Sequence, residues 1–322
     1  MTVKGGDYLA ISNAISIKDM TRFEWLQERN KGIGGSDASI ILGLNKYKTA
    51  FELWLEKTGQ VEPSELDNEA IYWGNQMENV VAKEFEKRTE KRVRRRNFMF
   101  SHPDYPFIKA NLDREVLRES AILECKTASA YLKGEWEGDE IPASYLVQVQ
   151  HYLGVTGKEK GYIAVLIGGN YFVWKEVERD DELIQMIIKA EVDFWNTHVI
   201  GGIPPQLDGS SAAEQYLKEK YSNAEEGKEV VLPSSYKDLL QQYEQIKSDE
   251  KLIQTAKKDI ENKLKAELKD AEVGIIDTHM VTWKNVVSNR VDTKTLKEKF
   301  PHTYKEVIKP STSRRFSIKE LN

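Results

Sequence analysis

Two carboxylates and an amine that could together hold a metal ion and orient water come from one short stretch of the chain. Asp113 precedes Glu124 and Lys126, and the last two are separated by a single residue. The stretch is predicted to form a hairpin with strands over 110–117 and 121–127. Because side chains alternate along a strand, Glu124 and Lys126 share one face, and the hairpin brings Asp113 across from them. Carboxylates suit a hard cation and the amine can orient water, which predicts a magnesium-dependent phosphodiesterase.

The alternative is that these residues are solvated charges on an exposed hairpin. Charged residues make up 31% of the chain, so an acid-x-lysine pattern also arises without a site. The choice between the two interpretations depends on the other elements that could position the three side chains.

A glycine-rich segment offers a possible anion site. Residues 32–39 read Gly-Ile-Gly-Gly-Ser-Asp-Ala-Ser and lead into an apolar run. Glycines allow close backbone approach, and Ser36 or Asp37 can cap a following helix whose free N–H groups bind a phosphate. The alternative is an ordinary glycine turn before a helix.

Glu78 is a third acid in a suggestive position. It lies on a helix predicted over 68–90, between the apolar residues Met77 and Val81 on the helical net. A carboxylate beside an apolar face needs a partner, for which a metal ion is one candidate. A solvated place at the margin of that face is the other interpretation.

Basic residues crowd the segment that follows. A strand is predicted over 91–100, with Arg92, Arg94 and Arg96 on one face. Such a row suits a phosphate track, and it equally suits a solvated edge strand.

The remaining pattern predicts an α/β domain of about 200 residues followed by a different C-terminal region. Gly201-Gly202-Ile203-Pro204-Pro205 marks the boundary. Beyond it comes a long helix that we expect to pack partly on its own chain, because Glu250 and Lys257 interrupt a coiled-coil seam. The other predicted elements are helices from Asp19 or Thr21 to Asn30 and over 49–57, 143–155, 181–198 and 233–270, strands over 161–167 and 171–177, and a small β segment over 273–287.

Composition excludes several classes of site. The single cysteine, Cys125, excludes an internal disulfide and cysteine-ligated clusters, and the five histidines lack metal-binding spacing. The net charge of −5 means that DNA would have to be bound by local basic patches. No apolar run is long enough for a membrane span and no secretory signal is seen, so we expect a cytoplasmic protein.

Five stretches occur in an order typical of one nuclease family. They are Trp25-Leu-Gln-Glu-Arg29, Gly32-Ile-Gly-Gly-Ser36-Asp37, Trp73-Gly-Asn-Gln-Met-Glu78-Asn, Leu112-Asp113 with Glu124-Cys125-Lys126, and Tyr145-Leu-Val-Gln148-Val-Gln-His-Tyr152. Over residues 18–200 the chain resembles the YqaJ/lambda-exonuclease family of phage recombination nucleases, a branch of the PD-(D/E)XK superfamily. One departure is Leu112-Asp113-Arg114, where many relatives have Pro-Asp-Gly.

The resemblance implies a fold and a domain division. The expected fold is a PD-(D/E)XK nuclease core, a central mixed β-sheet flanked by helices, over residues 1–208. Residues 209–322 would form a C-terminal extension built on the long helix and the small β segment.

The resemblance also implies roles for individual residues. Glu78, Asp113, Glu124 and the backbone carbonyl of Cys125 would hold two Mg²⁺ ions, for which Mn²⁺ can substitute. Lys126 would position or deprotonate the attacking water, which Gln148 would orient. Further residues would contact the DNA end and its 5′ phosphate: Arg29, Ser36, Gly35, Trp25 and Tyr145.

The implied activity is 5′-to-3′ digestion of one strand of double-stranded DNA from an end, which leaves a 3′ single strand for recombination. A single-strand annealing protein and a homotrimer are the implied partners, and a phage or prophage is the implied origin. Two alternatives remain open. One is a structure- or sequence-specific endonuclease of the same fold, and the other is a non-catalytic DNA-end-binding scaffold.

Overall fold

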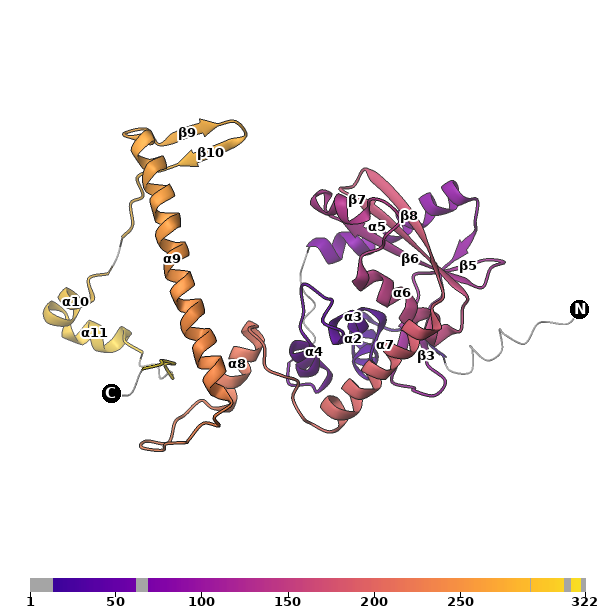
Figure 1. Cartoon of the computed structure of the whole chain (residues 1–322), viewed down its shortest axis with the longest axis horizontal. Coiled ribbons are helices and arrows are strands. Elements are labelled where there is room, and N and C mark those ends of the chain that lie inside the picture. Colours follow the sequence, from indigo (N-terminus) through magenta and orange to yellow (C-terminus); the bar gives the residue numbers. More distant parts are fainter. Residues whose placement is uncertain (1–13, 62–68, 290, 310–313, 320–322) are drawn as a thin grey trace, which may run out of the picture. The chain divides into compact units, whose positions relative to one another are not determined.

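The computed structural model divides into two compact units, Met1–Glu219 and Lys220–Asn322. Figure 1 shows their elements. The structure describes residues 14–61, 69–289, 291–309 and 314–319. Every residue predicted for the site belongs to the N-terminal unit.

A five-stranded mixed sheet runs through the N-terminal unit in the order β2-β5-β6-β7-β8. The pair β6 and β7 is parallel, whereas the other neighbours are antiparallel. The strands are β2 Val93–Arg94, β5 Arg114–Val116, β6 Ala121–Ala128, β7 Lys160–Ile167 and β8 Tyr171–Glu178.

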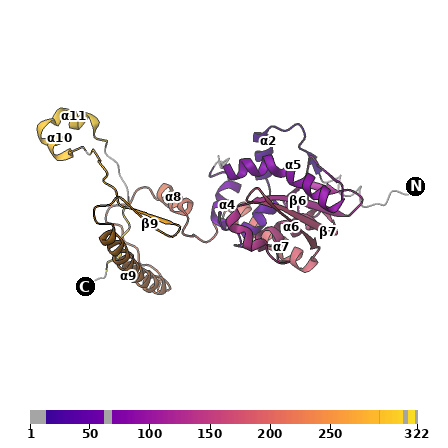
Figure 2. The same ribbon diagram turned by 90° about the horizontal axis from the view of Figure 1, so that it is seen from above.

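Helices cover both faces of this sheet, with α5 on one face and α6 and α7 on the other (Figure 2). Alternation along β6 explains the two layers, because Leu123 packs with residues of α5 whereas Ile122 packs with residues of α6. The predicted α/β class, a mixed sheet flanked by helices, is confirmed. The helices of this unit are α2 Arg22–Asn30, α3 Gly35–Ile41, α4 Ala50–Lys57, α5 Glu69–Thr89, α6 Ala143–Thr156, α7 Asp181–Phe194, a 3-10 helix Ala130–Trp136, a π-helical turn Trp195–Ile200 and most of α8 Ser211–Lys220.

Local capping explains where two of these helices begin. The Thr21 side chain accepts a hydrogen bond from the Glu24 N–H at the start of α2, and Thr49 does the same for Glu52 at the start of α4. In both helices the glutamate carboxylate bonds back to the threonine N–H, which completes a capping box. Both starts agree with the sequence prediction.

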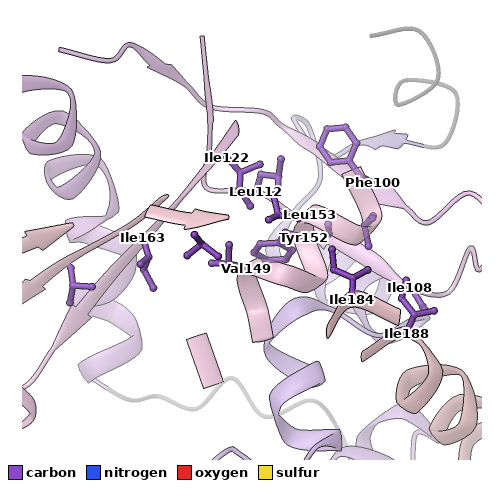
Figure 3. Packing of buried hydrophobic residues seen from close by; sticks show 14 of the residues in the cluster. Phe100, Ile108, Leu112, Ile122, Val149, Tyr152, Leu153, Ile163, Ile184 and Ile188 are labelled. Atoms are coloured by element: carbon purple, nitrogen blue, oxygen red, sulfur yellow. The ribbon is translucent and has the colours of Figure 1, made fainter. Parts of the chain in front are cut away.

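Helix α6 lies at the centre of the largest hydrophobic cluster. Figure 3 shows Val149 and Leu153 of this helix near Ile122 of the sheet and Ile184 of α7. Packing on both sides fixes the rotation of the helix about its axis. The rotation directs Gln148, the residue before Val149, toward Glu124 of β6.

A smaller antiparallel sheet, in the order β1-β3-β4, accounts for two differences from prediction. Its strands are β1 Ala14–Ser16, β3 Phe98–Ser101 and β4 Lys109–Asn111. The strand predicted over 110–117 was wrong as one element, because β4 and β5 belong to different sheets and the chain breaks at Asp113. At that point the Asp113 Oδ2 atom, rather than a backbone carbonyl, accepts the N–H of Cys125 at 2.8 Å. The strand predicted over 91–100 is likewise divided, into β2 and β3.

The C-terminal unit is built on the long helix α9. Its elements are α9 Tyr236–Leu268, the hairpin of β9 Val273–Ile276 and β10 His279–Thr282, α10 Thr293–Lys299 and α11 Pro301–Val307. Packing on its own chain is confined to part of the helix. Leu268 is buried near Gly274 and Tyr243 contacts Phe316, whereas Ile246, Ile253 and Ile260 are exposed.

The boundary between the units lies later than the predicted division after residue 208. Helix α8 explains the difference, because its Tyr216 ring packs against Phe51 and Trp54 of the N-terminal unit. None of the described helices, α9 included, is both long and apolar enough to cross a bilayer.

Candidate active site

Two carboxylates and a lysine meet where β5 and β6 diverge. Glu124 Oε1 accepts hydrogen bonds from Lys126 Nζ at 2.8 Å and from Gln148 Nε2 at 2.7 Å. Asp113 lies opposite Glu124 in the register of the hairpin, next to the pair of Arg114 with Leu123. The convergence predicted from strand alternation is therefore present in the structure.

These charges strongly affect one another. Burial and the neighbouring Glu124 carboxylate raise the pKa of Asp113 well above its usual range. Burial alone would lower the pKa of Lys126, but Glu124 and Asp113 outweigh it and raise that pKa above its ordinary value. The cluster of two acids and one base holds one negative charge in excess when all three are ionised, and a cation would relieve it.

Glu78 lies beside these acids but has a cationic partner of its own. Its Oε1 accepts a short hydrogen bond from Arg114 Nη1, which also donates to the backbone carbonyl of Asp113 at 2.6 Å. Arg95 Nη2 lies 3.8 Å from the same oxygen. Arg114 thus ties Glu78 of α5 to the strand break at Asp113.

The carboxylates of Asp113 and Glu124 are potential ligands of a metal ion. Among the described residues, no three histidine, cysteine or acidic side chains form a group that could hold a metal ion as they stand. Magnesium does not need three protein side chains, since it commonly binds one or two protein carboxylates and keeps several waters. Asp113 and Glu124 supply such a pair. Burial and the Glu124 charge raise the pKa of Asp113, and a bound cation would offset both effects. The residues present fit Mg²⁺.

Gln148 connects the acids to the glycine-rich segment. Its Nε2 also lies 3.0 Å from the Tyr152 hydroxyl. Gly35 packs directly on these two side chains, because a Cβ atom there would be 2.5 Å from the Tyr152 ring and 3.1 Å from Gln148. A side chain at position 35 would therefore displace the residue that bonds to Glu124.

The predicted phosphate-binding residues form a corner next to the acids. Arg29 Nη2 donates to Ser36 Oγ at 2.7 Å. Ser36 and Asp37 are not N-caps as predicted, because α3 begins at Gly35 and its N-cap is Gly34. The Gly34 N–H is used internally, by the Asp37 carboxylate at 3.0 Å. Positive charge at this corner therefore comes from Arg29 rather than from a free N–H of Gly34.

Two predicted aromatic contacts occupy different places. Trp25 lines the cleft, with the guanidinium groups of Arg22 and Arg29 over its ring at 4.4 and 5.5 Å. Tyr145 instead lies beside the lysine of the acid cluster, whose Nζ is 5.5 Å from its ring centre. Tyr145 is therefore placed to orient Lys126, and it is not among the residues that line the cleft.

The basic segment before β3 is divided between two environments. Arg94 and Arg96 both donate to Glu115 Oε2, at 2.9 and 2.8 Å, and Lys158 contacts the other oxygen of Glu115. Two of the three arginines predicted as a phosphate track are therefore held in an ion network. Arg95 lies toward Glu78 instead, and both Arg95 and Arg96 line the cleft, whereas Arg94 does not.

One cleft of about 670 Å³ joins the acid cluster, formed by Asp113, Glu124 and Lys126, to the arginine corner, formed by Arg29 and Ser36. Seven of its lining residues are basic and three are acidic, which suits a polyanion with a cation at one end. Its charged lining residues are Lys18, Arg22, Arg29, Arg95, Arg96, Lys109, Lys126, Glu78, Asp113 and Glu124.

Sequence reasoning missed several residues of this region. Arg95 belongs to the basic segment predicted as a strand over 91–100, but nothing in that pattern indicated its position near Glu78. Lys57 was taken only as part of a helix, although its Nζ lies 2.8 Å from Asp37 Oδ2. A lysine at a helix C-terminus is ordinary, so no local signal connects it to an aspartate twenty residues earlier.

Comparison with known sequences gives two matches. A sequence model described as the YqaJ-like viral recombinase domain matches residues 24–159. The uncharacterized protein YqaJ of Bacillus subtilis (strain 168) is 57% identical over 324 residues, and the alignment spans all of both chains.

Comparison with solved structures gives weaker likenesses. An alkaline exonuclease from Laribacter hongkongensis, LHK-Exo in complex with dAMP, aligns with a TM-score of 0.48 and 19% identity over 62% of this chain and 98% of that one. A phage-related exonuclease from Haemophilus somnus 129PT aligns with a TM-score of 0.43 and 15% identity over 53% of this chain and 96% of that one.

Proposed function

The chain belongs to the YqaJ-like viral recombinase family, and from this premise we propose that it is a magnesium-dependent deoxyribonuclease that digests one strand of duplex DNA from its 5′ end. The observation that carries the proposal is the shared cleft. The Asp113–Glu124–Lys126 cluster and the Arg29–Ser36 corner open into the same space, whose charged lining residues are mostly basic.

The acid cluster is assigned the chemical step. Asp113 and Glu124, with the backbone carbonyl of Cys125, would hold Mg²⁺, and Glu78 would take part through the water that magnesium retains. The ion supplies activation of water and stabilises charge on the leaving 3′ oxygen. Mn²⁺ would substitute, because it prefers the same oxygen ligands.

The protein groups around the acids have separate tasks. Lys126 lies beside Glu124 and would orient the attacking water and offset charge on the phosphate. Gln148 donates to the same oxygen of Glu124, which holds that carboxylate in place, and would orient the same water. Tyr145, against the Lys126 ammonium, would limit the movement of that side chain.

The arginine corner is assigned the recognition of the DNA end. Arg29 with Ser36 would bind the terminal 5′ phosphate, since a guanidinium is a strong charge-assisted donor to phosphate oxygens. Gly35 permits the close packing that sets this corner beside Gln148. Trp25, at the wall of the cleft, would contact the end of the duplex.

Digestion of this kind leaves a 3′ single strand, which is the substrate of a single-strand annealing protein. Such a protein is the partner we propose, with recombination as the setting. A homotrimer around the DNA is proposed from the family resemblance and would keep the enzyme on one strand.

The test is digestion of linear duplex DNA with Mg²⁺, comparing 5′-phosphate with 5′-hydroxyl ends. We expect mononucleotide release that depends on the phosphate and falls by about 10²–10⁴-fold in Lys126→Ala. Lys133→Ala is the matched control, because Lys133 lies over the Tyr171 ring and is not among the residues of the cleft. Cutting of closed circular duplex would indicate an endonuclease instead, and metal-independent end binding without nucleotide release would indicate a scaffold.

A further inference from the structure

A buried ion pair between Lys57 and Asp37 lies next to Arg29 of the arginine corner. Lys57 Nζ lies 2.8 Å from Asp37 Oδ2, and the two side chains are only 3% and 5% exposed. Burial lowers the pKa of Lys57, whereas Lys57 and Arg29 hold the pKa of Asp37 well below its usual range despite burial. A buried pair of this kind is costly in desolvation and calls for an explanation beyond stability.

Asp37 joins three segments of the chain through one carboxylate. Besides Lys57 of α4, its Oδ2 accepts the N–H of Gly34 at 3.0 Å. Its Oδ1 lies 3.6 Å from Arg29 Nη2, the atom that donates to Ser36 Oγ at 2.7 Å. The carboxylate therefore helps to set the position of the guanidinium that faces the cleft.

The three charges do not cancel. Arg29 and Lys57 carry two positive charges against the one negative charge of Asp37. Lys57 is enclosed and cannot reach a ligand in the cleft, whereas the Arg29 side chain is 36% exposed and lines it. Because Lys57 satisfies Asp37, the charge of Arg29 stays available to an anion.

We propose that Lys57 and Asp37 are positioning residues of the end-phosphate site, in which Lys57 neutralises Asp37 so that the Arg29 guanidinium stays beside Ser36 and open to the 5′ phosphate. The inference rests on the proposed function of this corner. It assigns phosphate recognition to a charge balance between α2, α3 and α4 rather than to Arg29 alone.

The charge balance predicts opposite results for a single and a double variant. In Lys57→Met, Asp37 keeps its buried charge and Arg29 becomes its only cationic partner, so the guanidinium is drawn from Ser36. In Asp37→Asn with Lys57→Met both buried charges are gone, the amide oxygen introduced at position 37 still accepts the Gly34 N–H, and Arg29 is free again. A role in packing alone would make the double variant no better than the single one.

The readout is the ratio of affinities for duplexes with 5′-phosphate and 5′-hydroxyl ends, measured by fluorescence anisotropy in EDTA so that catalysis plays no part. We expect the ratio to fall about tenfold in Lys57→Met, equivalent to about 1.4 kcal/mol. It should return to within about threefold of wild type in the double variant. Lys48→Met is the matched control, because Lys48 pairs with Glu56 near the same helix and does not touch Asp37.

The outcomes separate this inference from the proposed function. A wild-type protein that ignores the 5′ phosphate would overturn both. A wild-type preference that survives in Lys57→Met, or that is lost in the single variant and not recovered in the double one, would overturn the charge balance only. If Lys57→Met does not fold and so binds neither end, the double variant, once shown to be folded, gives the answer. A preference for the 5′-phosphate end equal to that of wild type would support the charge balance, and loss of that preference would overturn it.

Discussion

Asp113 and Glu115 are two residues apart, one just before β5 and one within it, yet their surroundings are opposite in sign. Glu115 receives three cations, Arg94, Arg96 and Lys158, and its pKa falls to about 2 because these hydrogen bonds outweigh its burial. Asp113 faces Glu124, and its pKa is raised. Glu115 therefore has more positive charge around it than it needs, whereas the negative charge of Asp113 and Glu124 together is not balanced by Lys126.

The difference separates a structural cluster from a functional one. A carboxylate with three cationic partners has no need of a ligand and adds to the stability of the fold. A pair of like charges in a cleft is a cost to the fold, which natural proteins accept where a ligand supplies the missing charge. Alternation along an unbroken strand would send both residues to one face, and the break at Asp113 turns it away from the ladder that holds Glu115.

Among the changes that test this comparison of Asp113 with Glu115, the largest effect is expected for Asp113→Asn. Removing one of the two like charges should reduce nuclease activity by about 10²–10³-fold. In EDTA the same change should raise the free energy of unfolding by about 1 kcal/mol, because the repulsion with Glu124 is gone. Activity assays and urea unfolding measure the two sides. A variant that is both less active and less stable would contradict the conclusion that Asp113 destabilises the fold.

Glu115→Gln should show the reverse. Three cations would lose their common partner, so the free energy of unfolding should fall by about 2 kcal/mol, discounted because Arg94 is half exposed. The cleavage rate of the folded protein should be unchanged. Chemical denaturation and a single-turnover assay give both values, and a loss of rate without loss of stability would contradict the structural role.

Acid should remove the contribution of Glu115 in a defined window. Its folded-state pKa of about 2 lies below the ordinary value of 4.5. The stabilisation is therefore fully present above about pH 4.5 and is lost as the pH falls toward 2. The difference in unfolding free energy between wild type and Glu115→Gln should shrink over that window, as followed by urea titrations at several pH values. A constant difference down to pH 2 would refute this linkage.

The smallest effect is expected for the adjacent arginines. Arg95→Gln should weaken DNA binding about three- to tenfold and reduce the salt slope by about one, because Arg95 lines the cleft. Arg94→Gln is the matched control, since its guanidinium is engaged by Glu115, and it should leave DNA affinity unchanged. Binding isotherms at several salt concentrations would show the contrast, and equal effects of the two changes would argue against it.

Much of the site could be predicted because it depends on local rules. Strand alternation and a short turn bring Glu124, Lys126 and Asp113 together, and both rules can be read from the order of residues. The starts of α2 and α4 follow from threonine caps. The roles assigned to these residues stay proposals that the experiments above test.

The prediction was weakest where long charged side chains choose among distant partners. The sequence suggested that Arg94 and Arg96 form a phosphate track, and only the fold shows that both donate hydrogen bonds to Glu115. The tie between Glu78 and Arg114 was equally hidden. An arginine can reach an acid from many backbone positions, so sequence separation gives no estimate of its partner.

The sequence by itself determined the α/β class, the long helix α9 and the three residues at the centre of the site, because hydrophobic periodicity and strand alternation act over a few residues. The tertiary structure alone decided which acids were satisfied. Lys57 meets Asp37 only after α3 and α4 have packed, and Asp113 keeps its unbalanced charge only because the chain breaks between two sheets. Charge balance at a site is a sum over segments that folding brings together, and no single stretch of sequence contains it.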